Sequence, residues 1–355
     1  MHNRLAVLGQ GQLGWMLARA GDRLGLKVDL LDPQKAVPPE AGTPITVESE
    51  HWPDNVSTRA LQEQSGWQNT RALSQLVDRR RQKALLDELS LATSPWCQPA
   101  ETDTPESLHK QLGSDFFLKS ARGGYDGKGQ VRFQAGQTQP FPEWKSEAIA
   151  ESAIPFDTEV SLVGARGRQG QCVFYRLTEN LHQKGVLTLS LSQAGRFGAV
   201  QAQAEEMLSR LMAHLDYVGV MAMECFLVGD RLLINEIAPR VHNSGHWTQD
   251  GASLSQFELH LRALLDWPLP QPAQPGTSLM INLLGLEHPL SWLHVAGARL
   301  YWYGKSLRPG RKMGHINMTH EDPAQLIEWL KAMPLPEDYL ASRDWALERL
   351  GAQPA

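Results

Sequence analysis

The segment from Ile234 to Trp247, INEIAPRVHNSGHW, concentrates chemically active side chains behind a short apolar start. It holds an acid, two amides, an arginine, a serine and two histidines, namely Asn235, Glu236, Arg240, His242, Asn243, Ser244 and His246. Three kinds of site could use them: a transition-metal site, part of a nucleophilic triad, or a polar pocket for phosphates and a small anion. The choice depends on the rest of the chain.

Two glutamates, Glu224 and Glu236, interrupt the apolar runs VMAMECFLV and LLINEIA. A carboxylate in an apolar strand is costly unless it is paired or binds a cation. A two-residue turn at Gly229-Asp230 would place Glu224 opposite Asn235, whereas a three-residue turn or a bulge would place it opposite Glu236. We predict the second register, whose oxygen ligands suit Mg²⁺, with Mn²⁺ as an alternative. The competing interpretation is one glutamate paired with an arginine at a strand end.

Zinc chemistry is disfavoured. His242 and His246 are four residues apart, but Ser-Gly separates them and a proline precedes them, which argues against a helical histidine pair. The three cysteines, Cys97, Cys172 and Cys225, are too scattered for a zinc site or a disulfide framework.

A first glycine turn, with Gly9, Gly11 and Gly14, follows an expected strand over 4–8 and begins a helix over 13–24. Together with Asp32 at the end of a second strand, it matches a dinucleotide-binding fingerprint, so an NAD-dependent oxidoreductase is one hypothesis. A tight strand-to-helix turn that binds no dinucleotide would select the same glycines.

A second glycine loop, KSARGGYDGKGQ over 119–130, lies between two expected strands. It is no Walker A loop, because Gly129 follows Lys128 where serine or threonine is required. Its amides could fold over phosphates and close as a lid, with Lys119 neutralising charge. The alternative is a solvated turn.

The surrounding elements predict an α/β (α+β) protein. We expect a strand–helix–strand opening, a helix over 74–89, strands over most of 116–177, and a helix over 200–215. The proline-rich stretch 266–276 then precedes a smaller terminal unit with strands at 279–284 and 299–303. With 355 residues and a net charge of -5, we expect two or three domains and no nucleic-acid partner. No apolar run is long enough for a signal peptide or a bilayer span, so we expect a cytoplasmic protein.

Five motifs in order along the chain resemble the ATP-grasp ligases and, among them, the N-carboxyaminoimidazole ribonucleotide synthases of purine biosynthesis. They are GQGQLG, GGYDGKGQ, EVSLVGARG, NEIAPRVHNSGHW and RPGRKMGH. The resemblance implies a doubly wound pre-ATP-grasp domain over 1–78, an ATP-grasp domain over 79–275 and a C-terminal domain over 276–355. It also implies a homodimer.

The reaction implied by this resemblance is a ligation. ATP phosphorylates bicarbonate to carboxyphosphate, which carboxylates the exocyclic amine of aminoimidazole ribonucleotide. A related alternative is a formate-dependent ligase acting on glycinamide ribonucleotide. An NAD enzyme would have no use for the glutamate pair or the second glycine loop.

By the same resemblance, site residues fall into four sets. The ATP set is Arg79, Lys119, Gly123, Gly124, Tyr125, Asp126, Gly127, Lys128, Gly129, Glu151, Ile154, Glu159, His182, Asn235 and Glu236. The metal ligands are Glu224 and Glu236. The residues enclosing bicarbonate and carboxyphosphate are Arg240, His242, Asn243, Ser244 and Gly245. The ribonucleotide set is Tyr125, Asp126, Lys128, Lys305 and Arg311, with Glu48 or Glu50.

Overall fold

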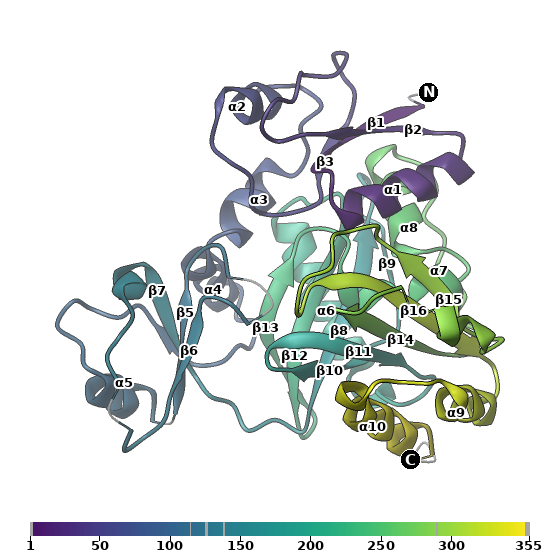
Figure 1. Ribbon diagram of the computed structural model, residues 1–355. Helices are drawn as coiled ribbons and strands as arrows, with labels where there is room; N and C mark the ends of the chain where they lie inside the picture. Colours follow the sequence, from purple (N-terminus) through teal and green to yellow (C-terminus); the bar gives the residue numbers. More distant parts are fainter. Residues whose placement is uncertain (1–2, 114, 125–126, 138, 289, 352–355) are drawn as a thin grey trace.

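The structure is a computed structural model that describes residues 3–351 apart from 114, 125–126, 138 and 289. The amino-terminal unit, purple in Figure 1, has a parallel sheet of order β2-β1-β3. Its strands are β1 (Arg4–Leu8), β2 (Lys27–Leu31) and β3 (Ile45–Val47), and its helices are α1 (Gln12–Arg23), α2 (Val56–Gln62) and α3 (Thr70–Leu76). The expected strand–helix–strand opening is confirmed.

The single helix expected over 74–89 is wrong. The chain forms α3 and then a separate helix, α4 (Arg79–Glu88). The two are divided at Asp78, whose backbone is extended (φ -108°, ψ 117°) and whose carboxylate accepts a hydrogen bond from the Arg80 amide. The apolar spacing continues through both helices, so it does not reveal this N-cap.

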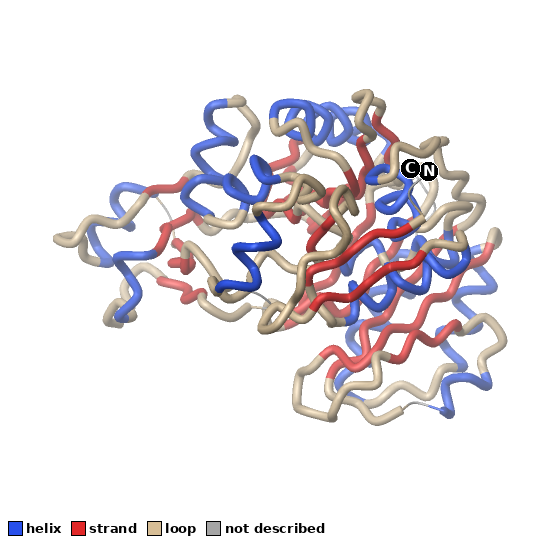
Figure 2. The backbone as a smooth tube through the Cα atoms, turned by 90° about the horizontal axis from the view of Figure 1, so that it is seen from above, coloured by secondary structure: helices blue, strands red, loops and turns tan. Residues whose placement is uncertain are grey.

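A small lobe follows, with a four-stranded sheet of order β4-β7-β5-β6. Its elements are β4 (Trp96–Cys97), α5 (Pro105–Leu112), β5 (Phe116–Ser120), β6 (Gln130–Phe133), η1 (Glu143–Glu147) and β7 (Ala148–Ser152). Phe116 and Phe133 stack in its own core, with ring centroids 4.9 Å apart. Figures 1 and 2 both show this lobe projecting to one side of the molecule.

The central sheet has nine strands in the order β13-β12-β8-β10-β11-β14-β16-β15, with β9 paired to β8. The first of these in sequence are β8 (Thr158–Arg166), β9 (Cys172–Phe174), β10 (Thr178–Gln183), β11 (Val186–Ser192), β12 (Gly219–Val228) and β13 (Arg231–Ala238). Alternate residues face opposite cores: Leu162 packs with α6 (Gly198–His214), and Val163 packs with α8 (Gln256–Leu264). The sheet is therefore covered on both faces where it carries the site.

The carboxy-terminal segment continues this sheet, because β14 (Thr277–Leu284) pairs with β11. The strands expected at 279–284 and 299–303 are present, but they form no separate sheet. The remaining elements are η2 (Asn243–Gly245), α7 (Thr248–Gly251), η3 (Leu290–His294), β15 (Arg299–Trp302), β16 (Lys312–His320), α9 (Pro323–Ala332), η4 (Glu337–Tyr339) and α10 (Leu340–Gly351). Within the described ranges, no helix has the length and apolar character needed to cross a bilayer.

Asp78 ties α4 to the second glycine loop. Its carboxylate accepts hydrogen bonds from Arg80 Nη2 at 2.6 Å and Arg122 Nε at 3.0 Å, and its side chain is only 3% exposed. Burial alone would raise the pKa of this carboxyl, but the bonds from the two arginines outweigh burial and lower it to about 2. The ionised form thus stabilises the folded chain.

We expect Asp78→Asn to lower the free energy of unfolding by about 2 kcal/mol at pH 7, the linkage value of this pKa difference. Since the folded pKa lies below the unfolded one, the contribution is present above about pH 4 and is lost as pH falls toward 2. Urea unfolding of both proteins across this pH range measures it. The exposed pair of Asp54 with Arg59 supplies the control, Asp54→Asn, which should have little effect. Equal losses for the two variants would contradict the assignment.

Candidate active site

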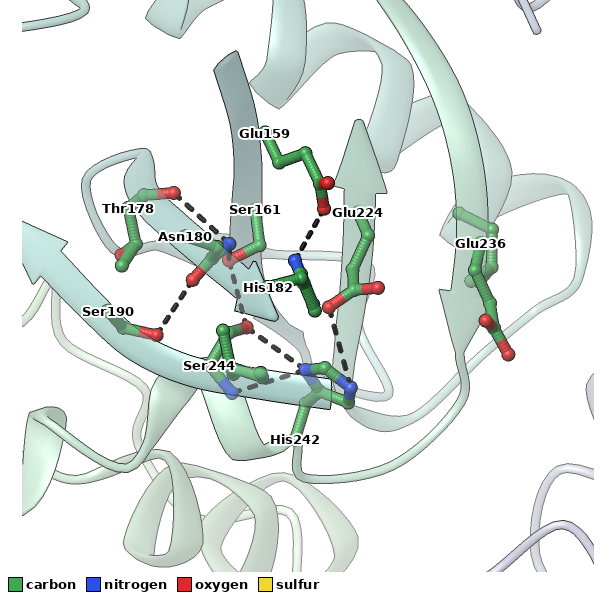
Figure 3. A network of polar contacts seen from close by, with 12 residues as sticks. Glu159, Ser161, Thr178, Asn180, His182, Ser190, Glu224, Glu236, His242 and Ser244 are labelled. Carbon is green, nitrogen blue, oxygen red and sulfur yellow. Dashed lines mark hydrogen bonds and ion pairs between the residues drawn. The ribbon is translucent and has the colours of Figure 1, made fainter. Parts of the chain in front are cut away.

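The β12–β13 hairpin sets the geometry of the site. Its strands meet at Gly229 and Asp230, since Val228 pairs with Arg231, and the register shifts between Glu224 and Cys225. Cys225 pairs with Ile234 and Glu224 pairs with Glu236, so Asn235 is the extra residue of a bulge. The predicted register, with Glu224 opposite Glu236, is confirmed, and Figure 3 shows the two acids on neighbouring strands.

The two carboxylates differ in environment. The Glu224 side chain is 18% exposed and the Glu236 side chain is 49% exposed. Burial raises the pKa of Glu224 to about 7; the charge of His182 opposes this, whereas the charges of Glu236 and Glu159 add to it. A cation bound at this pair would remove the repulsion.

The protein offers two carboxylates, Glu224 and Glu236, to a hard cation at this place, which is fewer ligands than a site built by the protein alone would need. Among the described residues, no group of three or more histidine, cysteine or acidic side chains is arranged to hold a metal. Mg²⁺ in nucleotide sites commonly binds one or two carboxylates and completes its shell with phosphate oxygens and water. Glu224 and Glu236 match that arrangement.

A buried ion network lies beside this pair. Glu151, 3% exposed, accepts from Lys119 Nζ at 2.5 Å and from Lys83. Burial would raise the pKa of Glu151, but the two lysines lower it to about 2. Lys119 Nζ also donates to Asn235 Oδ1 at 3.1 Å, which joins the small lobe to the bulge. Lys83 was missed by sequence reasoning, because it lies in the basic run RRRQK, which suggests a solvated face.

The second glycine loop packs onto Arg79. Arg79 Nη2 donates to the Gly124 carbonyl at 3.1 Å and lies 3.4 Å from Glu236 Oε1. A Cβ on Gly124 would lie 2.9 Å from the Lys128 carbonyl, and one on Gly127 would lie 2.9 Å from the carbonyl of Lys184 in the β10–β11 turn. The close packing therefore requires glycine. Tyr125 and Asp126, predicted to contact ATP and the ribonucleotide, lie outside the described residues.

On β8 and β10, Glu159 Oε2 and His182 Nδ1 are 2.5 Å apart. Burial lowers the pKa of His182, but the hydrogen bond to Glu159 and the charge of Glu224 outweigh it and raise the pKa. These two predicted ATP residues are therefore paired with each other, and Figure 3 shows them beside Glu224. Ile154 follows β7 and is partly exposed.

The segment 240–245 forms a wall next to Glu224. Arg240 Nε is 2.9 Å from Glu50 Oε1. His242 Nε2 is 3.8 Å from Glu224 Oε1, beyond hydrogen-bond distance. Asn243 is 7% exposed, and neither polar atom of its side-chain amide has a hydrogen-bond partner among the described residues. Such an unsatisfied buried amide is suited to a ligand.

The Gln256 side chain fixes this wall from α8. It accepts from the His242 amide at 2.9 Å and donates to the His242 carbonyl at 2.6 Å. A Cβ on Gly245 would lie 2.7 Å from Gln256 Oε1, so this close approach requires glycine. Gln256 carries no motif signal in the sequence.

The backbone amides of the first glycine turn are already occupied by a carboxylate of the protein. The Glu48 carboxylate accepts from the amides of Gly11 at 2.5 Å and Gly14 at 2.7 Å, at the N-terminus of α1. These are the amides that would bind a dinucleotide pyrophosphate. The structure therefore argues against the NAD hypothesis.

The β15–β16 connection reaches the same turn. Lys305 donates to the side chain of Gln12 at the start of α1, and Arg311 Nη1 donates to Ser306 Oγ at 2.8 Å. The first contact brings Lys305 to the amino-terminal unit, although 293 positions separate it from Gln12 in sequence. Arg311 lies in the same connection and contacts Ser306 within it.

We expect Glu224→Gln to raise the free energy of unfolding by about 3 kcal/mol at pH 8 without nucleotide or metal, because it removes a desolvated carboxylate. The folded pKa lies above the unfolded value, so ionisation costs stability as pH rises from about 4.5 to 7. The gain should therefore shrink at pH 5. Denaturant unfolding at both pH values measures it, with Glu206→Gln, at an exposed position of α6, as the control that should have little effect. A destabilised Glu224→Gln at pH 8 would contradict this interpretation.

Comparison with protein-family models gives two matches. Residues 84–257 match the ATP-grasp domain, and residues 278–328 match the phosphoribosylaminoimidazole carboxylase C-terminal domain. The curated N5-carboxyaminoimidazole ribonucleotide synthase of Escherichia coli is 48% identical over 353 residues, covering 98% of this chain and 99% of that protein. The Haemophilus influenzae protein of the same name is 47% identical, with 97% of each chain covered.

Solved structures of proteins with closely similar names also resemble this chain in fold. N5-carboxyaminoimidazole ribonucleotide synthetase from Thermus thermophilus matches with a TM-score of 0.80 and 38% identity, covering 94% of this chain and all of that one. The Aspergillus clavatus synthase, solved with ADP and 5-aminoimidazole ribonucleotide, matches with a TM-score of 0.78 and 26% identity, covering 97% and 100% of the two chains. The chain belongs to the N5-carboxyaminoimidazole ribonucleotide synthase family of ATP-grasp enzymes.

Proposed function

We propose that this protein is an ATP-dependent carbon–nitrogen ligase that carboxylates the exocyclic amine of aminoimidazole ribonucleotide with bicarbonate. Family membership supports the overall reaction. The observation that carries the site assignment is the glutamate pair on the β12–β13 bulge, which lies directly beside the wall 240–245. A phosphate donor and a small acceptor anion must nearly touch for phosphoryl transfer, and this arrangement permits that.

The reaction has two steps. A bicarbonate oxygen forms a bond to the γ-phosphorus of ATP and ADP leaves, which gives carboxyphosphate. The carboxyl carbon then bonds to the amine nitrogen, its bond to the phosphate oxygen breaks, and the amine releases a proton. The products are ADP, phosphate and the N-carboxy ribonucleotide.

The ATP site combines the second glycine loop, Arg79, Lys119, Glu151, Glu159 and His182. Lys119, fixed between Glu151 and Asn235, offers positive charge to the phosphates without reorganising. Glu224 and Glu236 would hold Mg²⁺. That ion, when bound, neutralises charge on the transferred phosphoryl group.

The acceptor site is the wall 240–245. Arg240, oriented by Glu50, offers charge-assisted hydrogen bonds to bicarbonate and carboxyphosphate. The unsatisfied amide of Asn243 can both donate and accept. Its neighbours His242 and Ser244 complete the contacts.

The ribonucleotide site lies between the first glycine turn and the β15–β16 connection. Lys305 and Arg311 provide charge for a phosphomonoester, and Lys128, Tyr125 and Asp126 come from the second glycine loop. Of the two candidate acids, Glu50 contacts Arg240 of the acceptor site, whereas Glu48 contacts the first glycine turn. The domain boundaries at 78 and 275, the homodimer and the cytoplasmic location remain predictions.

The decisive experiment measures ADP release by the purified protein with ATP and Mg²⁺ while one substrate at a time is omitted. We expect turnover only when bicarbonate and aminoimidazole ribonucleotide are both present, with Glu224→Gln inactive although folded. Equal turnover with formate and glycinamide ribonucleotide would favour the related ligase and overturn the proposal.

A second measurement addresses substrate binding. We expect Arg311→Ala to raise the KM for the ribonucleotide about tenfold or more with little change in kcat, since a phosphate contact is made in ground and transition states alike. Arg343→Ala, which breaks an ion pair with Asp344 on α10, is the matched control. A fall in kcat at unchanged KM would contradict the phosphate role of Arg311.

A further inference from the structure

A buried set of polar side chains runs from the central sheet to His242. It consists of Asn180 on β10, Ser161 on β8, Ser190 on β11 and Ser244 on η2. Each is at most 4% exposed. Figure 3 shows these residues joined in one chain of hydrogen bonds that ends on the imidazole. Asn180, Ser161 and Ser190 have no part in the proposed reaction.

One end of this chain fixes the orientation of the Asn180 amide. Asn180 Nδ2 lies 3.4 Å from the carbonyl oxygen of Thr178, which can only accept a hydrogen bond. The amide nitrogen must therefore face that side, and Asn180 Oδ1 accepts from Ser190 Oγ at 2.7 Å. The same Nδ2 donates to Ser161 Oγ at 2.9 Å.

The directions of the next bonds follow, because each hydroxyl has only one proton. Ser161 Oγ accepts from Asn180, so its proton goes to Ser244 Oγ at 2.8 Å. The Ser244 hydroxyl then donates to His242 Nδ1 at 3.0 Å. We call the three hydrogen bonds that link Asn180, Ser161, Ser244 and His242 the relay.

The backbone at the His242 end of the relay supports the same bond direction independently. The backbone amide of Ser244, which can only donate, points at His242 Nδ1 at 3.3 Å. Nδ1 thus faces two donors and must be unprotonated.

We propose that Asn180, acting through the hydroxyls of Ser161 and Ser244, is a positioning residue that holds neutral His242 with its proton on Nε2. This nitrogen points to the side of Glu224, where the wall 240–245 faces the glutamate pair. His242 is then a hydrogen-bond donor to the acceptor anion and cannot act as a base through Nε2. The tautomer stands on geometry alone, whereas its catalytic consequence rests on the proposed function.

The tautomer can be measured without turnover. In the full-length protein labelled with ¹⁵N on the histidine rings, we expect His242 to show an unprotonated Nδ1 and a protonated Nε2 at pH 7.5, with His242→Gln identifying the signals. A proton on Nδ1, or on both nitrogens, would overturn the proposal.

Two matched variants test the relay. Asn180→Ala removes the amide that orients Ser161, whereas Ser190→Ala removes a hydrogen bond from the acceptor side of the same amide and leaves the direction of the relay intact. We expect only Asn180→Ala to shift the His242 nitrogen signals and to lower kcat about tenfold, the scale of one hydrogen bond, with KM for ATP unchanged. If Asn180 had a purely structural role, both variants should change the His242 nitrogen signals and kcat alike. That result, or no shift of the signals in either variant, would overturn the relay.

If Asn180→Ala does not fold, Ser161→Ala cuts the same connection with the loss of one oxygen atom and should shift the same signals. Failure of the ADP-release assay with the expected tautomer present would overturn the proposed function and leave the relay standing. A successful ADP-release assay with a different His242 tautomer would overturn the relay and leave the proposed function standing.

Discussion

The bulge at Asn235 is the constraint on which the rest of the site depends. Side chains on a strand alternate between faces, so without the extra residue Glu224 and Glu236 would lie on opposite sides of the hairpin. The bulge places both acids on one face and leaves Asn235 available to Lys119. Arg79 Nη2 then lies 3.4 Å from Glu236, and His242 Nε2 lies 3.8 Å from Glu224.

Charge in the site is organised before any substrate arrives. Two of the basic groups that would meet an anion are held by acids of the protein: Lys119 by Glu151, and Arg240 by Glu50. Such pairs fix long side chains in place, so that less reorganisation is needed when phosphate or bicarbonate charge develops. Glu224 differs, because no basic side chain neutralises it within hydrogen-bond distance among the described residues. Burial and the repulsion from Glu236 and Glu159 raise its pKa, and a bound cation would relieve that repulsion.

Three parts of the chain supply the walls of the site, and no one of them could form it alone. The amino-terminal unit contributes the first glycine turn and Glu48, the small lobe contributes the second glycine loop, and the central sheet contributes the hairpin. The carboxy-terminal strands extend that sheet and carry Lys305 to Gln12. Substrates bound at this junction would be brought together by packing between elements that are far apart in sequence.

The sequence by itself determined most elements, both glycine loops and the family, since these depend on local periodicity and on motifs. It also reduced the hairpin to two registers, but only the pairing of β12 with β13 showed that a bulge, with a two-residue turn, brings the acids together. The tertiary structure alone decided that Glu48 binds the first glycine turn, that Asp78 divides the expected helix, and that Lys83 is buried against Glu151. Asn180, Ser161 and Ser190 resemble ordinary polar positions of β-strands, and their relation to His242 exists only once three strands and the 240–245 wall are assembled. These contacts join residues up to about 80 positions apart, and local sequence patterns carry no record of which distant partner a polar side chain will meet.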